Sequence, residues 1–480
     1  HLARDGAGGV DDQQVVAYDL AHAAAVVGTA RAALVYGARG PVEARLAVAF
    51  TADALADVGA RLAGREQAWG VEIGALDPTR EFVASYRDPA WLAGLAAEAV
   101  PTSLDGDFGL VADTFRRFAD QEIAPVAGDI HRHNTDIPEH IIAGLGQLGA
   151  FGLSIPEAYG GYATGDESDY LGMVIATEEL SRASLGAGGS LITRPEILAR
   201  ALIAGGTEEQ KRRWLPGLAT GEIMAGVAVT EPDFGSDVAG LKVAATPDGD
   251  EWVVRGTKTW STFAARADVL MLLARTDPDS ARAHRGLSLF VVEKARGDGQ
   301  GFVLTQPAGG RLEGRPIDTI GYRGTHSYEL AFDDWRVPAA NLIGGDTGLG
   351  RGFYLQMEGF DAGRLQTAAR AVGVMQAAYE AARAYAGERV VFGRPVGSYQ
   401  LTQVKLARMA CIIAASRAYM YEVARLMAKG DGALEASMIK AYVCRAAEWV
   451  AREAMQIHGG MGYAEEYAVS RYFVDARVLS

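Results

Sequence analysis

Residues 230–237 read TEPDFGSD and follow directly on the apolar run MAGVAV, residues 224–229. Proline, aspartate and glycine are typical of a tight turn, so we expect a strand to end here. The turn has a hydroxyl at each end, on Thr230 and Ser236, and Gly235 allows close approach to the backbone. The segment is therefore either an ordinary turn that caps the next element or a surface that offers hydroxyls and backbone N–H groups to a flat polar ligand.

The residues around this turn favour β structure. From about residue 225 to residue 338, short apolar or alternating segments predominate, and turns such as Pro247–Asp250 separate them. This spacing is typical of strands that hairpins connect. On either side the periodicity is helical instead, since Val111, Phe115 and Phe118 are spaced four and three residues apart.

The chain of 480 residues is long enough for several hydrophobic cores. Its patterns predict a mainly α protein with a central β domain. The expected parts are an N-terminal helical extension (1–104), a helical domain (105–224), the β domain (225–338) and a C-terminal helical domain (339–480). In the last part, long Ala-rich helices are expected to end near Arg389, Lys429 and Ile457.

Charge and cysteine usage restrict the class of protein. A formal net charge of −14 argues against nucleic acid or an anionic membrane as the main partner. Cys411 and Cys444 lie in apolar helical segments, which favours two buried thiols in the reducing cytoplasm over a disulfide or a metal site. No leader-like segment and no uncharged apolar run of membrane-spanning length occurs, so we expect a soluble intracellular protein.

Common catalytic and nucleotide-binding motifs are missing or weak. The chain has no GxxxxGK[ST] loop, no HExxH pair and no GxSxG elbow. The glycines of GLGRG (348–352) precede a helix, but no strand-forming run comes before them, so they do not make a dinucleotide-binding fingerprint. Phosphate-loop, metal and hydrolytic chemistry are therefore poorly supported, and we expect no metal.

Four segments, taken in order, are specific: TEPDFGSDVAG (230–240), RGTKTWSTFAARADVLMLLART (255–276), ERVVFGRPVGSYQ (388–400) and QIHGGMGYAEEYAVSRYFVDAR (456–477). Together they resemble the acyl-CoA dehydrogenase family, which binds FAD. The resemblance covers about residues 105–480. It implies a helical domain, a β-barrel or β-sandwich domain and a C-terminal helical bundle, preceded here by the helical extension.

The resemblance implies that the flavin ring lies against the β domain. The side chains and backbone groups expected to bind it are those of Val229, Thr230, Gly235, Ser236, Trp260, Ser261 and Thr262. On this interpretation the TEPDFGSD turn is a ligand-binding surface, which Pro232 stiffens and Gly235 opens to the cofactor.

A second group of residues matches positions that reach the adenosine diphosphate part of FAD on a neighbouring subunit. It comprises Arg389, Phe392, Gln400, Gln456, Gly459 and Gly460. A guanidinium suits a pyrophosphate because it offers paired donors in one plane. The shared site implies a homo-oligomer, with a dimer favoured. Val391 departs from the family, whose members often carry a hydroxyl there, and His458 is expected to pack near the loop rather than to act in catalysis.

The family reaction needs a carboxylate base for the α-proton of an acyl thioester. In most members it is a glutamate that follows the segment matching Asp475–Arg477, so we expect it just past Ser480 and assign no catalytic residue. Another branch carries it immediately before the arginine that matches Arg364, where this chain has Gly363. Ser236, Asp361 and Arg364 match positions that contact the acyl-CoA substrate.

The stretch ELSRASLGAGGSLITRP (179–195) is Gly-rich and contains Arg194, near the floor of the family's acyl pocket. A cation there could pair with a free carboxylate of the substrate, although it could equally be an ordinary surface arginine. Arg323 and His326 are weaker candidates for the same role. The expected substrate is a short, branched dicarboxylic acyl-CoA, with an electron-transferring flavoprotein as electron acceptor.

Three alternatives remain open at this point. The protein could oxidise another short-chain acyl-CoA, it could be an acyl-CoA oxidase that passes electrons to oxygen, or it could be a catalytically silent relative that serves as a scaffold. Rapid reoxidation of the reduced flavin in air distinguishes the oxidase from the dehydrogenases.

Overall fold

The computed structural model describes residues 9–98, 100–101, 104 and 106–480. These residues form two compact units. Unit 1 contains the described residues up to Leu110 together with Thr367–Ser480, and unit 2 contains Val111–Gln366. Both boundaries fall inside helices: the first inside α7 (Asp107–Phe118), and the second inside α13 (Gly352–Glu388), whose first part belongs to unit 2 and whose last part belongs to unit 1.

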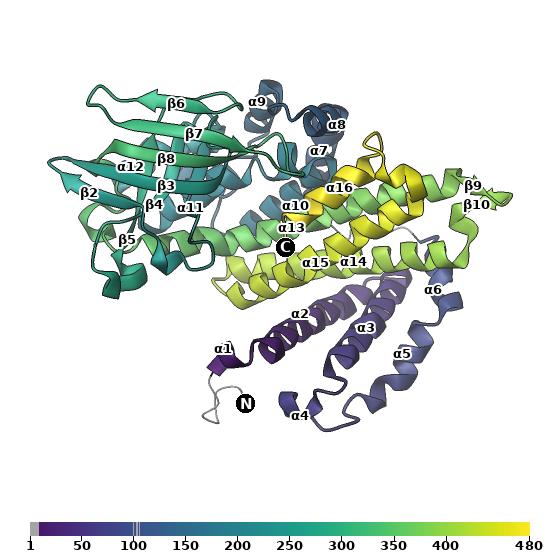
Figure 1. Cartoon of the computed structure of the whole chain (residues 1–480). Helices are drawn as coiled ribbons and strands as arrows, with labels where there is room; N and C mark the ends of the chain where they lie inside the picture. The colour runs from purple at the N-terminus through teal and green to yellow at the C-terminus, as the bar shows by residue number, and fades with distance from the viewer. Residues whose placement is uncertain (1–8, 99, 102–103, 105) are drawn as a thin grey trace. The chain divides into compact units, whose positions relative to one another are not determined.

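Unit 2 begins with helices that surround a sheet (Figure 1). The α-helices are α7 (Asp107–Phe118), α8 (Ala124–His133), α9 (Glu139–Gln147), α10 (Glu167–Ala183), α11 (Thr193–Gly205) and α12 (Glu208–Thr220). A π-helical turn, η2 (Ala119–Ile123), joins α7 to α8, and a second, η4 (Leu185–Gly189), lies between α10 and α11. Thr207 begins α12 with a capping box, in which its side chain and that of Gln210 each bond the other's backbone N–H.

The strands of unit 2 form one eight-stranded mixed sheet in the order β1-β4-β2-β3-β8-β7-β6, with β5 paired to β4. Their bounds are β1 (Ala225–Ala228), β2 (Ala244–Asp248), β3 (Glu251–Thr262), β4 (Val269–Arg275), β5 (Leu287–Glu293), β6 (Phe302–Thr305), β7 (Arg311–Ile317) and β8 (Ser327–Pro338). Strand β4 runs parallel to β1 and β2, and the other pairs are antiparallel. The predicted turn at Pro247–Asp250 is the hairpin between β2 and β3.

Strand β4 is buried on both of its faces. Its residues Leu270 and Leu272 belong to a core that includes side chains from α9 and α10. The alternate residues Met271 and Leu273 belong to a second core with side chains from α11 and α12. Because successive side chains point to opposite faces, a strand covered on both sides must be apolar throughout. This explains the unbroken run VLMLLA in the sequence.

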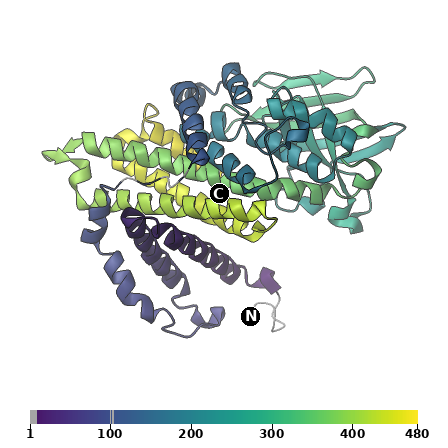
Figure 2. The same cartoon turned by 180° about the vertical axis from the view of Figure 1, so that it is seen from behind.

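Unit 1 is helical (Figures 1 and 2). The extension contributes α1 (Gly9–Asp12), α2 (Gln14–Gly37), α3 (Pro41–Leu62), α4 (Glu66–Trp69), α5 (Arg80–Tyr86) and α6 (Pro89–Leu95). The C-terminal part adds the end of α13, a small hairpin of β9 (Val390–Val391) and β10 (Arg394–Pro395), and then α14 (Gln400–Ala428), α15 (Ala433–His458) and α16 (Ala468–Arg477). Helix α2 packs against α3, α14 and α15.

Several predictions from the sequence are confirmed. The long helices end at Glu388, Ala428 and His458, each within one residue of its predicted end, and both cysteines are buried free thiols. By length and composition, α2 is the one described helix that could cross a membrane. A helix in the core of a folded bundle meets the same criteria, and α2 buries a row of small side chains, including Ala23, Ala30 and Ala33.

Candidate functional site

A buried ion pair anchors the TEPDFGSD turn of unit 2. The Lys258 ammonium, on β3, is fully buried and lies 2.8 Å from a carboxylate oxygen of Glu231 in the turn. It also donates a hydrogen bond of 2.8 Å to the carbonyl oxygen of Val229. The Glu231 carboxylate accepts further hydrogen bonds from the backbone N–H groups of Lys242 and Val243, each at 2.8 Å. The N-terminal end of the turn is thus bonded to β3 and to the segment that leads into β2.

This anchoring brings together the two halves of the predicted flavin surface. The N–H of Thr259 donates to the carbonyl oxygen of Thr230 at 2.8 Å, so the turn lies beside the end of β3. Ser236 and Gly235 are exposed at the tip of the turn, and a side chain at Gly235 would meet nothing within 4 Å. The backbone there is open to a ligand.

A β-bulge determines which residues at the end of β3 face outward. The pairing of β3 with β8 shifts register between Lys258 and Ser261, and Trp260 has φ of +56°. Without this shift, the two-residue period of a strand would turn Lys258 and Trp260 to the same face. Instead Lys258 and Ser261 are buried, whereas Trp260 is 56% exposed. Thr262 is buried as well, with its hydroxyl 3.3 Å from that of Ser327.

Burial lowers the pKa of Lys258 from 10.5 to about 8, and the nearby Glu231 carboxylate offsets part of that shift. Between these two pH values the unfolded chain binds more protons than the folded chain at this site, so the free energy of unfolding rises with pH. We therefore expect the wild type to gain stability from about pH 8 to pH 10.5 relative to a Glu231→Gln/Lys258→Met variant. Calorimetric unfolding across this range measures the difference, and a flat or falling difference would contradict the assigned pKa.

The second predicted cofactor surface lies in unit 1, at the ends of α13 and α15. The rings of Tyr385 on α13 and His458 on α15 are stacked with centroids 4.2 Å apart, and Tyr467 meets both rings edge-on. His458 is buried and its Nδ1 lies 2.8 Å from the carbonyl oxygen of Ala454. Desolvation lowers its pKa. These contacts agree with the packing role expected of His458.

Around this aromatic stack, the predicted residues are exposed: Arg389, Phe392, Gln400, Gln456, Gly459 and Gly460. Phe392 is 98% exposed at the tip of the β9–β10 hairpin, with φ of +50°. The hydroxyl of Tyr399 donates to the carbonyl oxygen of Val391 at 2.8 Å, which fixes the hairpin to the start of α14. An almost fully exposed phenyl ring at a fixed position suits a surface that another molecule covers.

The predicted substrate residues occupy three places in unit 2, the first of which is Ser236 in the turn described above. Asp361 and Arg364 lie one turn apart on α13 and form an ion pair with each other. Arg194 lies in the first turn of α11, partly buried, and its Nη2 donates to the hydroxyl oxygen of Tyr322 at 2.9 Å. The structure does not group Arg194 with an acidic side chain in the described part of the chain.

The two weaker carboxylate-binding candidates have structural partners instead. The Arg323 guanidinium donates to the carbonyl oxygens of His131 (2.7 Å) and Thr319 (3.1 Å). Nε2 of His326 lies 2.9 Å from a carboxylate oxygen of Asp136. Although burial alone would raise the pKa of Asp136, hydrogen bonds from His326 and from the Gly299 N–H lower it. Arg323 and His326 therefore hold their loop in place.

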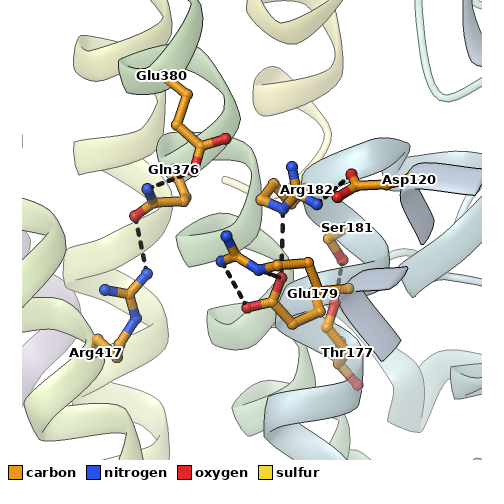
Figure 3. A network of polar contacts seen from close by, with 9 residues as sticks. Asp120, Thr177, Glu179, Ser181, Arg182, Gln376, Glu380 and Arg417 are labelled. Carbon is orange, nitrogen blue, oxygen red and sulfur yellow. Dashed lines mark hydrogen bonds and ion pairs between the residues drawn. The ribbon is translucent and has the colours of Figure 1, made fainter. Parts of the chain in front are cut away.

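The two other charged side chains of the stretch 179–195, Glu179 and Arg182, are neutralised within unit 2. Glu179 accepts two hydrogen bonds of 3.0 Å from Arg116. Arg182 donates to Glu179 at 3.3 Å and forms an ion pair with Asp120 (Figure 3). Arg194 thus differs from Arg182, since only Arg182 has carboxylate partners.

The residues of both surfaces fit FAD. The hydroxyl oxygen of Ser261 is buried and has no hydrogen-bond partner in the part of the chain that the structure describes. Next to it Trp260 offers an exposed aromatic face, and side chains at Gly459 and Gly460 in unit 1 would meet nothing within 4 Å. Open glycine backbone, free hydroxyls and exposed arginine are groups that hold a flavin and its pyrophosphate. When bound, FAD would supply a two-electron acceptor.

Lys258 and Glu231 anchor the turn of the candidate site, and sequence reasoning missed both. The sequence carried one signal, a lysine within the otherwise uncharged run TKTWST, where a buried strand would not tolerate a charge without a partner. Tyr322, the neighbour of Arg194, was missed as well. No sequence signal connects it to Arg194, because the two residues are 128 positions apart.

Comparison with known proteins yields consistent matches. Family models match in three parts: the acyl-CoA dehydrogenase N-terminal domain at residues 108–222, the middle domain at 226–335 and the C-terminal domain at 350–480. The chain is 42% identical over 428 residues to (2S)-methylsuccinyl-CoA dehydrogenase of Cereibacter sphaeroides, covering 87% of this chain and 76% of that relative.

Solved structures agree with these matches. A glutaryl-coenzyme A dehydrogenase in complex with glutaryl-CoA superposes with a TM-score of 0.71 at 32% identity, covering 78% of this chain and 91% of the other. A glutaryl-CoA dehydrogenase of Mycobacterium smegmatis in complex with FADH2 gives a TM-score of 0.69 at 28% identity, covering 78% and 90%.

Proposed function

Because this chain belongs to the acyl-CoA dehydrogenase family, whose members are FAD-dependent oxidoreductases, we propose that it oxidises (2S)-methylsuccinyl-CoA to mesaconyl-CoA. The product carries a new double bond between the α- and β-carbons of the acyl group. Support for this substrate comes from the identity to methylsuccinyl-CoA dehydrogenase and from one side chain in unit 2.

That side chain is Arg194, and it is the reason for proposing a dicarboxylic substrate. Its guanidinium is partly buried next to Tyr322, and its Nε is fully buried without an acceptor among the described residues. A partly buried cation is costly unless an anion neutralises it. The free carboxylate of methylsuccinyl-CoA would supply that anion, whereas a monocarboxylic acyl chain would not.

The reaction removes two hydrogens from the acyl group. A carboxylate base would take the α-proton of the acyl group, and FAD held at the TEPDFGSD turn and the end of β3 would supply the acceptor for the β-hydrogen and its electron pair, so that the acyl group loses two electrons and gains a double bond. We propose that the base is a glutamate that follows Ser480 in the full protein. Thr262 and Trp260 would orient the flavin edge, and Asp361 and Arg364 the CoA arm.

Two partners complete the proposal. An electron-transferring flavoprotein would reoxidise the flavin, and a second copy of the chain would share each FAD through the exposed surface around Phe392. We propose a homodimer in the cytoplasm, in which the helical extension covers the surface that other members use to form tetramers. Light scattering that gave a tetramer would contradict this role of the extension.

An anaerobic titration of the full-length holoenzyme tests the reaction. Methylsuccinyl-CoA is expected to bleach the oxidised flavin absorbance, while butyryl-CoA and glutaryl-CoA, as controls, bleach it more slowly. Bleaching by butyryl-CoA alone would retain a dehydrogenase and remove the role of Arg194. A flavin that none of the three esters bleaches would point to a different substrate or to a silent scaffold. Rapid reoxidation in air would identify an oxidase.

A further inference from the structure

The loop that precedes β8, residues 319–326, has an unusual backbone. Tyr322 and His326 have φ of +59° and +46°, and Gly324 has φ of +95°. Non-glycine residues in this region cost about 1–3 kcal/mol each, so the surrounding structure must hold them there. The contacts that do so are those of Arg323 with the carbonyl oxygen of His131 and of His326 with Asp136. Strain of this kind concentrates where a side chain must be aimed.

The loop is also seated against the π-helical turn η4. A side chain at Gly186 would place its Cβ 2.4 Å from the carbonyl oxygen of Arg323, so the two backbones touch. This close approach, which only glycine allows, brings Tyr322 to the start of α11. There its hydroxyl forms a short hydrogen bond with the hydroxyl of Ser190 and accepts one of 2.9 Å from Arg194. Ser190 is fully buried and Tyr322 nearly so.

A second arginine on α11, Arg200, has a carboxylate partner, which Arg194 lacks among the described residues. Six residues further on, Arg200 donates to the hydroxyl of Tyr170 at 2.7 Å, just as Arg194 donates to Tyr322. Arg200 in addition donates to the Glu196 carboxylate at 2.7 Å. Within the described chain Arg194 has no carboxylate in that place, and its Nε donates to no acceptor. The helix therefore carries two tyrosine–arginine pairs, of which only one is neutralised by the protein itself.

We propose that Tyr322 is a specificity-determining positioning residue, whose hydroxyl, backed by Ser190, holds the Arg194 guanidinium ready for the free carboxylate of a dicarboxylic acyl-CoA. This inference rests on the proposed function. A free arginine side chain loses rotamer entropy when it binds an anion, and a guanidinium already fixed by a rigid tyrosine loses less. The same fixed cation disfavours an apolar acyl chain, because such a chain would bury the charge without a partner.

The test compares Tyr322→Phe with the wild type as full-length holoenzymes. Loss of one hydrogen bond to a charged group corresponds to a roughly tenfold or larger fall in kcat/KM for methylsuccinyl-CoA, which we expect mainly in KM. The kcat/KM for butyryl-CoA should stay within about twofold of the wild type. Tyr159→Phe is the matched control. Tyr159 lies in the same unit, but its hydroxyl donates to the exposed Glu208 carboxylate and takes no part in holding Arg194. Tyr159→Phe should leave kcat/KM unchanged for both acyl-CoA esters.

Ser190→Ala provides a second variant that leaves the strained loop untouched. Like Tyr322→Phe, it should lower the ratio of kcat/KM for methylsuccinyl-CoA to kcat/KM for butyryl-CoA, but by a smaller factor. The inference therefore stays testable if Tyr322→Phe does not fold. An equal loss for both acyl-CoA esters would reduce Tyr322 to a structural role. An unchanged ratio in both variants would also overturn the inference.

Ligand-binding measurements distinguish a failure of this inference from a failure of the proposed reaction. The dissociation constants of succinyl-CoA and butyryl-CoA are measured by calorimetry on the wild type and on Tyr322→Phe. A weaker affinity of the variant for succinyl-CoA alone supports the positioning role even if methylsuccinyl-CoA does not bleach the wild-type flavin, in which case only the proposed reaction fails. If methylsuccinyl-CoA bleaches the wild-type flavin but the wild type and Tyr322→Phe bind succinyl-CoA equally well, the proposed reaction stands and Tyr322 has no positioning role.

Discussion

Glu231→Ala is expected to lower the free energy of unfolding by about 3–5 kcal/mol, because it leaves the Lys258 ammonium buried without its counter-charge. The loss of the acceptor for the Lys242 and Val243 N–H groups adds to the effect. Since Glu231 anchors the TEPDFGSD turn, the variant should also release FAD on gel filtration. Differential scanning calorimetry of the holoenzyme measures the stability change.

Two controls isolate the buried charge. The Glu231→Ala/Lys258→Met variant removes both charges and should recover most of the lost stability, because an apolar side chain is tolerated where an unpaired ammonium is not. Asp129→Ala removes one partner of the exposed pair with Arg132 and should cost less than about 1 kcal/mol. If Glu231→Ala cost no more than Asp129→Ala, the ion pair would not anchor the turn.

Arg194→Gln is expected to lower kcat/KM for methylsuccinyl-CoA by about 100-fold, because truncating one partner of a desolvated charge pair costs roughly 2–5 kcal/mol. The kcat/KM for butyryl-CoA should stay the same or rise, since the uncompensated cation beside Tyr322 is removed. Steady-state kinetics with an artificial electron acceptor measures both values.

Arg212→Gln is the matched control for this prediction. Arg212 is an exposed arginine of α12 in the same unit, paired with Glu208 on its own helix. Its replacement should leave both acyl-CoA esters unaffected. A similar loss for both esters in Arg194→Gln would show that Arg194 supports the fold rather than recognises a carboxylate.

Much of the fold could be predicted from local patterns. The ends predicted near Lys429 and Ile457 lie within one residue of the observed ends of α14 and α15. Helix periodicity and turn chemistry act over a few residues, so they can be read directly from a sequence. The segments that we expect to bind the flavin stand out because their motifs occur in a fixed order along the chain.

The details of the site could not be predicted in this way. The sequence alone left Arg194, Arg323 and His326 as candidates for the same carboxylate. The structure separates them, because Arg323 meets backbone carbonyls and His326 meets Asp136, while Arg194 meets a tyrosine hydroxyl. Whether a charged side chain is already neutralised depends on groups that the fold brings to it from elsewhere in the chain.

The sequence by itself determined the mainly helical architecture, the central β domain, the family and the FAD cofactor, because each depends on local periodicity or on motif order. Only the tertiary structure decided that Lys258 is neutralised by Glu231, that a β-bulge turns Trp260 outward, and that Arg194 meets Tyr322 but no carboxylate among the described residues. These partners lie 27 and 128 residues apart in the chain. Burial and charge compensation arise from such distant contacts, and no local pattern encodes them.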